Sequence, residues 1–221
     1  MMNDVLTLDQ SLETSKSNKL AYRFIKRVFD ILCSIIGILC LIPLTYLVKI
    51  CYLFSGDNHS VYYTQYRIGK NGKLFKIYKF RSMIPNADEA LDKILAENED
   101  LREEYRVYKK LRNDPRITKV GKFLRKTSLD ELPQFINVLL GQMSVIGNRP
   151  YMPKEIDDMG FYYEDIVSSK PGITGIWQTS GRSDTTFRYR CIIESFYSNN
   201  LGLLMDIKIF FKTFIVLFKG L

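Results

Sequence analysis

The apolar segment at residues 28–54 limits the fold more than any other feature of the sequence. It reads VFDILCSIIGILCLIPLTYLVKICYLF, and its 18 residues from Ile31 to Val48 carry no charge. This length is close to the minimum with which an α-helix crosses the hydrocarbon core of a bilayer. The sequence therefore predicts a protein held at a membrane.

Basic residues flank this segment on both sides. Those before it are Lys16, Lys19, Arg23, Lys26 and Arg27, with no acid among them. Those after it are Lys49, Arg67, Lys70, Lys73, Lys76, Lys79 and Arg81, with Asp57 as the only acid in that stretch. Basic flanks stay on the cytoplasmic face, and Pro43 interrupts the helical hydrogen bonds inside the run. A re-entrant helix bent near Pro43 satisfies both observations, and a tilted single span is the alternative.

The length of 221 residues favours one folded domain beside this anchor. We expect residues 1–27 to form a mobile basic tail, residues 28–54 the re-entrant helix, and residues 55–221 a domain at the cytoplasmic face. The predicted class is α+β, mainly helical with a small β-hairpin, in a monotopic membrane protein. Asn71-Gly72, between two aromatic and β-branched runs, predicts the hairpin turn.

Two amphipathic segments are expected in this domain. Residues 86–111 predict a helix broken near Asn98, whose acidic residues are expected to face water, away from an anionic partner. At the C-terminus, Lys208, Lys212 and Lys219 fall on one side of a helix whose other positions are largely apolar. This helix suits a lipid interface, and a C-terminal core helix is the alternative.

The net charge of +8 indicates an anionic partner, either nucleic acid, anionic lipid or a phosphorylated substrate. A single histidine argues against a His-rich metal site and against a Ser-His-Asp triad. Neither GxxxxGK[ST] nor GxGxxG occurs in the sequence, so arginines would have to hold a phosphate. The candidates are Arg81, Arg116, Arg125, Arg149 and Arg182.

Two adjacent acids, Asp130 and Glu131, stand in the stretch KTSLDELPQF. Ser128 and Glu131 fit a capping box at the start of a helix that Gly141 could end, so helix capping alone could explain the pair. A helix N-terminus with Arg125 nearby would also lower the pKa of Asp130 and keep it ionised as a nucleophile. Mg²⁺ bridging carboxylate and phosphate oxygens would offset the repulsion between Asp130 and a phosphoryl group.

The chain resembles the bacterial sugar transferase family, the monotopic phosphoglycosyl transferases that start the assembly of cell-surface glycans. Five blocks carry the resemblance, and they follow one another in the family's order. They are YKFRSM (78–83), DPRITKVGKFLRKTSLDELPQ (114–134), NVLLGQMSVIGNRP (137–150), KPGITGIWQTSGRS (170–183) and the final DIKIFFKT. Together with the anchor they cover about residues 22–221.

The resemblance implies transfer of a sugar 1-phosphate from a UDP-sugar to undecaprenyl phosphate, with release of UMP. Asp130 matches the family's nucleophile, Glu131 its partner at the Mg²⁺ site, and Arg125 a phosphate-contacting arginine. Four further residues match positions expected to line the nucleotide-sugar pocket: Lys79, Arg81, Arg149 and Arg182.

The implied place of action is the cytoplasmic face of the bacterial inner membrane, at the start of exopolysaccharide, capsule, O-antigen or glycoprotein glycan assembly. The expected partners are the UDP-sugar, undecaprenyl phosphate and the bilayer. No nucleic-acid partner is expected, because the anchor beside the basic stretch already accounts for the charge. Whether the chain forms a homo-oligomer, and which sugar it transfers, the sequence leaves open.

One departure from the family pattern concerns the loop that carries Arg149. GNRP stands where Gly-Pro-Arg-Pro is usual, so a less rigid loop is expected. The alternative function is a non-catalytic membrane-bound partner in a polysaccharide assembly complex. The presence of Asp130, Glu131 and Arg125 argues against that alternative.

Overall fold

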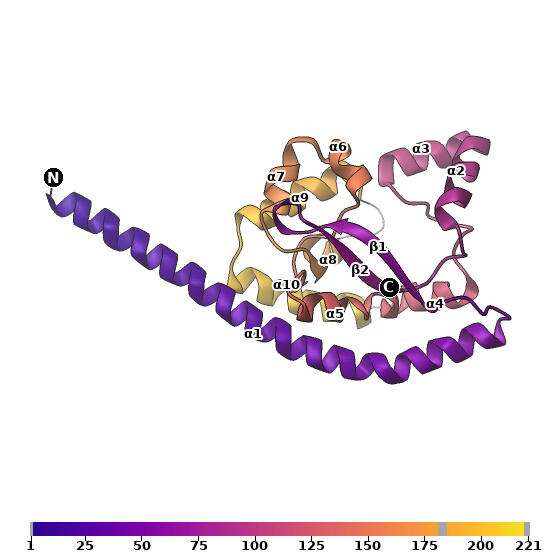
Figure 1. The fold of residues 1–221 in the computed structure, drawn as a ribbon. Helices are drawn as coiled ribbons and strands as arrows, with labels where there is room; N and C mark the ends of the chain where they lie inside the picture. The colour runs from indigo at the N-terminus through magenta and orange to yellow at the C-terminus, as the bar shows by residue number, and fades with distance from the viewer. Residues whose placement is uncertain (1, 181–184, 219–221) are drawn as a thin grey trace.

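The computed structural model describes residues 2–180 and 185–218, with side chains from Lys19 to Val216 within these ranges. One long helix passes along a smaller mixed domain that holds two short sheets (Figure 1). The elements are α1 (Met2–Phe54), β1 (Tyr62–Ile68), η1 (Lys70–Gly72), β2 (Leu74–Phe80), α2 (Ala87–Glu97), α3 (Glu99–Tyr108), α4 (Lys119–Lys126), η2 (Leu129–Glu131), α5 (Gln134–Leu139), β3 (Ser144–Ile146), η3 (Pro153–Glu155), α6 (Ile156–Met159), η4 (Gly160–Tyr162), α7 (Tyr163–Val167), β4 (Gly172–Thr174), α8 (Ile176–Thr179), α9 (Phe187–Asn199) and α10 (Leu203–Phe218). The predicted class, mainly helical with a small hairpin, is confirmed.

Helix α1 buries one narrow stripe against the domain. Leu41, Val48 and Tyr52 are no more than 5% exposed and pack on β2 and α4. Gly37 lies against the ring of Phe135 so closely that a Cβ would come within 2.3 Å of it. The spacing of these residues is that of one helix face, so α1 contacts the domain along its length rather than leaving it.

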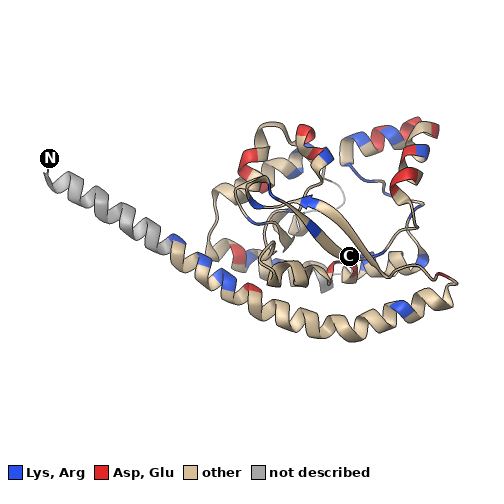
Figure 2. Ribbon diagram, in the orientation of Figure 1, with Lys and Arg blue, Asp and Glu red and all other residues tan. Residues whose placement is uncertain are grey.

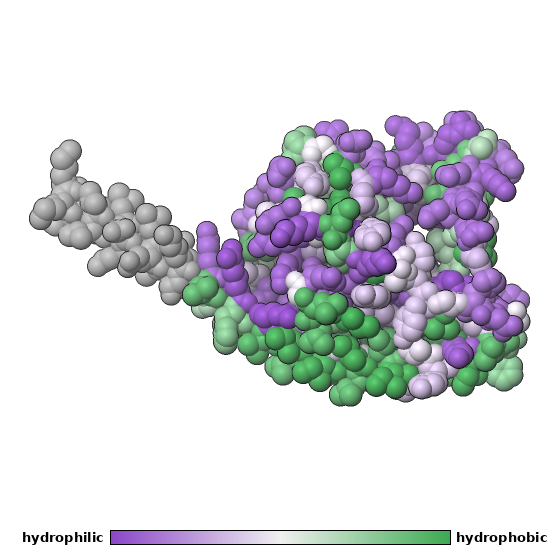
Figure 3. All heavy atoms as spheres, in the orientation of Figure 1, coloured by the Kyte–Doolittle hydropathy of each residue, from purple (hydrophilic) through white to green (hydrophobic). Residues whose placement is uncertain are grey.

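The rest of α1 is apolar and exposed. The part from Lys19 to Phe54 is long and apolar enough to cross a membrane by length and composition. Its exposed apolar residues include Leu32, Ile35, Ile36, Leu39, Ile42, Leu47, Ile50 and Leu53. Figure 3 shows this surface as a continuous hydrophobic band along the lower edge of the molecule. A band of this extent marks a membrane-interacting face.

Polar contacts fix the N-terminal half of α1 to the domain. Lys26 Nζ donates to Asp206 Oδ2 of α10 at 2.5 Å and to the Ile146 carbonyl at 2.9 Å. Buried Asp30 accepts hydrogen bonds from the Ser144 hydroxyl and the Val145 N–H. Tyr22, Lys26 and Arg27 are therefore held against the domain by side-chain hydrogen bonds. The assignment of residues 1–27 to a mobile tail stays a prediction.

The C-terminal end of α1 is fixed by an arginine. The Arg81 guanidinium donates to both carboxylate oxygens of Asp57 at 2.9 and 3.0 Å and lies 4.3 Å from the centroid of the Tyr52 ring. The Tyr52 hydroxyl donates in turn to the Arg81 carbonyl. Both ends of the apolar part of α1 thus contact the same domain.

The predicted hairpin is confirmed. β1 and β2 pair antiparallel from Tyr62 opposite Phe80 to Ile68 opposite Leu74. Asn71 and Gly72 in the turn have φ values of 57° and 75°, the left-handed conformation for which Asn-Gly is favoured. The turn contains a short 3₁₀ segment, η1, so it is longer than a two-residue turn.

The predicted break at Asn98 is also confirmed. Asn98 is extended between α2 and α3, and its side chain accepts a hydrogen bond from the Leu101 N–H as an N-cap. Acidic residues gather on α2 and α3, away from α1 (Figure 2). Two of them, Asp88 and Glu89, are exposed to water as expected and also line the cavity described below.

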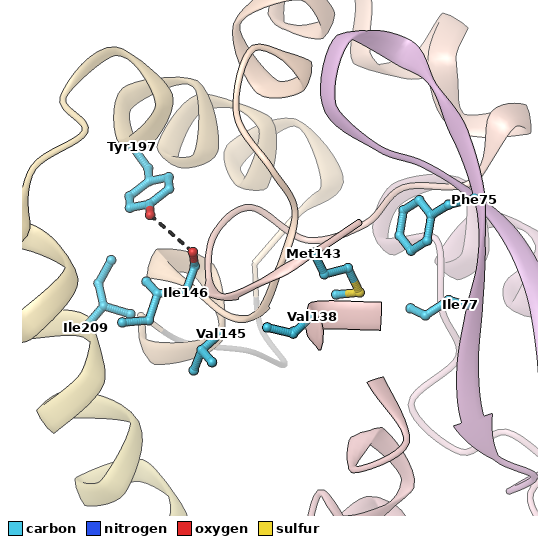
Figure 4. Packing of buried hydrophobic residues seen from close by; sticks show 8 residues of the cluster. All are labelled: Phe75, Ile77, Val138, Met143, Val145, Ile146, Tyr197 and Ile209. Atoms are coloured by element: carbon cyan, nitrogen blue, oxygen red, sulfur yellow. Dashed lines mark hydrogen bonds between the residues drawn. The ribbon is translucent and has the colours of Figure 1, made fainter. Parts of the chain in front are cut away.

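The main core lies between the hairpin, α5, β3 and α10. Phe75 and Ile77 of β2 pack in one cluster with Val138, Met143, Val145, Ile146, Tyr197 and Ile209 (Figure 4). β3 and β4 form a short parallel pair that the sequence analysis did not predict. In α10, Asp206 and Ile209 are buried while Leu204 and Phe211 are exposed, so this helix serves both the core and the apolar surface.

Candidate active site

Asp130 and Glu131 lie in the 3₁₀ turn η2, which follows α4 and contacts β2. Ser128 has a φ of 58° and makes no side-chain cap hydrogen bond, and α5 begins only at Gln134. The predicted capping box is therefore wrong, because Ser128 stands at the N-cap of η2 in a left-handed conformation and its side chain does not cap the turn. Gly141, with a φ of 78°, does follow the end of α5 as predicted.

Two basic residues converge on the acids from neighbouring elements. Lys79 Nζ of β2 pairs with Glu131 Oε1 at 2.7 Å. Arg125 of α4 donates from Nε to the Ser82 hydroxyl at 2.9 Å. Its helix presses so closely on Ser82 that a Cβ on Gly121 would come within 1.9 Å of the Ser82 carbonyl oxygen. Glycine at this position lets α4 bring Arg125 beside the acids.

Asp130 is only 8% exposed. Burial and the neighbouring Glu131 carboxylate raise the pKa of Asp130 to about 6, and the positive charges of Lys79 and Arg125 offset only part of this rise. The expectation of a lowered pKa is thus corrected, because loss of solvation outweighs the nearby cations. Asp130 is still mostly ionised at neutral pH, and its carboxylate is more basic than that of an exposed aspartate.

A cavity of about 570 Å³ opens beside these residues. Five of the predicted site residues line it: Lys79, Arg81, Arg125, Asp130 and Arg149. Glu131 lines a small adjoining cavity together with Lys79 and Arg149. Arg182 lies outside the described residues. A cavity of this volume is of the size that holds small-molecule ligands.

Two of the candidate arginines are occupied by structural partners. Arg81 is held by Asp57 at the end of α1, as described above. Arg116 donates to Asp114 at 2.6 and 2.8 Å and to the Ala87 carbonyl, at the start of α2. Both guanidiniums therefore hold the cavity wall in place. Lys79, Arg125 and Arg149 are the candidate cations for binding a phosphate.

The loop that carries Arg149 is well held, contrary to expectation. The Asn148 amide donates to the Ser198 hydroxyl at 2.6 Å and to the Ile166 carbonyl at 3.3 Å. Its carbonyl accepts from the Gly172 N–H at 2.7 Å. The asparagine that replaces the usual proline thus fixes the loop by hydrogen bonds rather than by ring geometry.

The sequence analysis missed several residues of the cavity wall. Arg67 points inward from β1, is 9% exposed and donates to the Pro150 carbonyl at 3.3 Å. Tyr63 and Tyr105 also line the cavity, on the side formed by the hairpin and α3. The one signal in the sequence for Arg67 was the alternation of side chains along a β-strand. It places Arg67 on the same face as Tyr63 and Gln65, which also line the cavity.

The acidic pair fits a magnesium ion held jointly with a substrate. Mg²⁺ is usually bound by one or two carboxylates together with phosphate oxygens and waters. Asp130 is a buried carboxylate beside a second carboxylate, and their repulsion contributes to its raised pKa. A divalent cation between the two would offset that repulsion. Asp130 and Glu131 are therefore the residues that would hold it.

Comparison with known proteins decides the family. The family model described as bacterial sugar transferase matches residues 21–220. The chain belongs to this family. The match covers the anchor helix, the acidic pair, the Arg149 loop and α10, so the resemblance inferred from five motifs extends over nearly the whole chain.

Several curated relatives share this similarity. The undecaprenyl-phosphate galactose phosphotransferase of Salmonella typhimurium is 46% identical over 199 residues, which span 88% of this chain and 40% of that protein. The exopolysaccharide production protein ExoY of Sinorhizobium fredii is 44% identical, over 85% of this chain and 83% of that protein. The Klebsiella pneumoniae UDP-glucose:undecaprenyl-phosphate glucose-1-phosphate transferase is 39% identical, over 88% of this chain and 40% of that protein. The chain thus spans about two fifths of the first and third relatives.

Proposed function

We propose that the protein transfers a sugar 1-phosphate from a UDP-sugar to undecaprenyl phosphate and releases UMP. The observation that carries this proposal is a buried aspartate in a cation-lined cavity, on a domain fixed along an apolar membrane helix. The named activities of the Salmonella and Klebsiella relatives support the same reaction class. The ExoY relatives support a place in exopolysaccharide production.

The reaction proceeds in two displacements. In the first, an Asp130 carboxylate oxygen attacks the β-phosphorus of the donor, the bond from that phosphorus to the bridging oxygen breaks, and UMP leaves. The product is an acyl phosphate between Asp130 and the sugar phosphate. In the second, a phosphate oxygen of the lipid attacks the same phosphorus. The bond to Asp130 then breaks, which regenerates the carboxylate and forms the lipid-linked diphosphate sugar.

Each residue of the cavity has a defined part in these steps. Burial makes Asp130 basic enough to attack while leaving it ionised at neutral pH. Lys79 holds Glu131 in place at 2.7 Å, and Arg125 and Arg149 offer guanidinium groups to the phosphate oxygens. Mg²⁺, when bound by Asp130 and Glu131, would neutralise phosphate charge and favour departure of UMP.

The same structure supports a re-entrant placement of α1. Lys26 and Tyr52 both contact the domain, and the helix rises about 39 Å from one of these residues to the other. A helix crossing the bilayer over that length would bring its two ends to opposite faces, where one folded domain could not contact both. We therefore propose that α1 enters and leaves the cytoplasmic face of the inner membrane, with its bend near Pro43.

Cysteine labelling tests this placement. In a background without native cysteines, Lys19→Cys and Lys73→Cys are both expected to react with an impermeant maleimide in inside-out vesicles and not in right-side-out spheroplasts. Ile36→Cys, on the exposed apolar face of α1, serves as the control and should stay unlabelled in both. Reaction of Lys19→Cys from the opposite side to Lys73→Cys would replace the re-entrant helix with a span.

A donor panel tests the reaction. Purified protein with undecaprenyl phosphate, Mg²⁺ and individual UDP-sugars should release UMP with at least one of them, and the radioactive sugar phosphate should move to the lipid phase. The most active donor identifies the sugar. Release of UDP instead of UMP would show a glycosyl transfer without the phosphate and contradict the proposal.

A further inference from the structure

A group of buried polar side chains surrounds the loop that carries Arg149. Among the described residues, the buried side-chain polar atoms without a hydrogen-bond partner all belong to residues around the 147–151 loop. They are Arg67 Nε, Asn148 Oδ1, Gln178 Oε1 and Arg190 Nε, together with Tyr151 Oη and Glu194 Oε2, which lie close enough to each other for each group to shift the other's pKa. Such atoms are rare in protein interiors because they destabilise the fold, so their concentration at one place indicates a functional demand on this loop.

Glu194 is the centre of this group. It comes from α9, has no solvent exposure, and accepts the backbone N–H of Arg149 through Oε1 at 3.1 Å. Burial raises the pKa of Glu194 to about 7. The charged and titratable groups that face it are Arg149 and Tyr151 from the loop and Arg190 and Cys191 from its own helix.

The Trp177 ring contacts both Arg190 and Arg149. The guanidinium carbon of Arg190 lies 4.2 Å from the centroid of the Trp177 ring, and that of Arg149 lies 5.3 Å from it. The ring is itself fixed, because its Nε1–H donates to the Thr185 hydroxyl at 2.6 Å. The Arg149 side chain thus rests on a tryptophan, while its backbone is held by Glu194.

We propose that Glu194 and Trp177 are positioning residues that fix Arg149 for binding of the donor diphosphate. Glu194 sets the backbone of the loop, and Trp177 sets the direction of the guanidinium by a cation–π contact. Neither side chain lines the cavity that holds Asp130 and Arg149, so both act through Arg149 rather than on the substrate. The inference rests on the proposed function for the identity of the ligand.

The arrangement explains why a carboxylate stays buried at this position. A guanidinium pointing at a phosphate must keep a fixed orientation, because a bidentate contact tolerates little rotation. The ionised Glu194 attracts both Arg149 and Arg190 and holds the loop more strongly than a neutral acceptor would. The protein therefore keeps a carboxyl group at this position although burial disfavours its ionised form.

Trp177 is the only tryptophan in the sequence, so it reports on its own surroundings. Titration of the purified wild-type protein with UDP is expected to change its fluorescence saturably, because a phosphate bound by Arg149 changes the charge next to the Trp177 ring. Glu194→Gln keeps the acceptor oxygen and the shape but removes the charge. We expect it to raise the Kd for UDP by about fivefold or more and to lower kcat/KM for the UDP-sugar to a similar extent.

A stability measurement separates positioning from a structural role. Between the ordinary pKa of glutamate and about 7, the folded protein holds a proton on Glu194 that the unfolded chain does not. Wild-type stability should therefore fall, relative to Glu194→Gln, as the pH rises from about 5 to about 8. At pH 8 the variant should melt no lower than the wild type while it binds UDP more weakly. Glu164→Gln, an exposed glutamate on α7, is the matched control and should change neither property.

Four outcomes are decisive. Weaker UDP binding by a Glu194→Gln protein of undiminished melting temperature supports the inference. An unchanged Kd and unchanged kcat/KM overturn it, as does a lowered melting temperature with an unchanged Kd in the folded fraction. The wild type could also bind UDP saturably, with a weaker Kd in Glu194→Gln, and yet release no UMP from any donor. That result would leave this inference standing while the proposed function fails.

Discussion

Asp130→Asn is expected to lower UMP release from the UDP-sugar by at least about 1,000-fold, because an amide cannot form the acyl phosphate intermediate. Asparagine has nearly the shape of aspartate, and Asp130 is buried beside Glu131 with a raised pKa. Removing its charge therefore should not destabilise the fold. The measurement is UMP release with saturating donor and undecaprenyl phosphate.

The control for this variant is Asp157→Asn, an exposed aspartate on α6. It should keep wild-type turnover, and both variants should fractionate with membranes and melt near the wild-type temperature. Turnover of Asp130→Asn within a few fold of the wild type would show that another group attacks the phosphorus. Glu131→Gln is expected to retain more activity than Asp130→Asn, because Glu131 contacts Lys79 rather than the reacting atom.

The second large effect is expected from metal removal. EDTA should lower turnover by at least about 100-fold, and excess Mg²⁺ should restore it. The physical reason is the negative charge that the proposed reaction gathers at one point, where the donor diphosphate would meet the carboxylates of Asp130 and Glu131. Burial and the Glu131 carboxylate raise the pKa of Asp130 in spite of Lys79 and Arg125, so these two cations do not outweigh burial and repulsion together.

Melting of the protein with and without EDTA is the control for this experiment. An unchanged melting temperature together with lost turnover would assign the metal to the reaction rather than to the fold. Full activity in EDTA, after dialysis against the chelator, would remove the metal from the mechanism and leave the cations of the cavity to neutralise the phosphates alone.

The parts of the fold that were predictable are those set by local sequence. Asn71-Gly72 takes the left-handed turn that few other residues adopt easily, and Asn98 caps α3 with its own side chain. The apolar surface of α1 follows from composition, because so many uncharged residues in a row cannot all be buried by a domain of this size. These features depend on neighbours in the chain and survive in any tertiary context.

The parts that were not predictable depend on contacts between distant segments. The pKa of Asp130 was expected to fall, but the packing of η2 against β2 and α4 removes water from its carboxylate. The β3–β4 pair joins Ser144 to Gly172 across two short strands with little periodicity. Glu194 looks like an ordinary helical glutamate in the sequence, and only its complete burial against the Arg149 loop reveals it.

The motif resemblance predicts which residues belong to the site, and the structure shows unexpected contacts for two of them. Arg81 was expected at the nucleotide-sugar pocket, and it lines the cavity, but its guanidinium is bound to Asp57 at the end of α1. Arg149 was expected in a loosened loop, but Asn148 and Glu194 hold that loop on two sides. The motifs predict that Arg81 and Arg149 belong to the site, whereas only the structure shows which groups hold them.

The most direct test is the intact mass of the protein after incubation with the UDP-sugar alone, followed by rapid acid quench. The account predicts that the wild-type mass rises by one phosphosugar, that UMP appears in equal amount, and that Asp130→Asn shows neither change. Subsequent addition of undecaprenyl phosphate should return the protein to its original mass. A mass that never rises, with UMP appearing only when donor and lipid phosphate are both present, would contradict a covalent intermediate on Asp130.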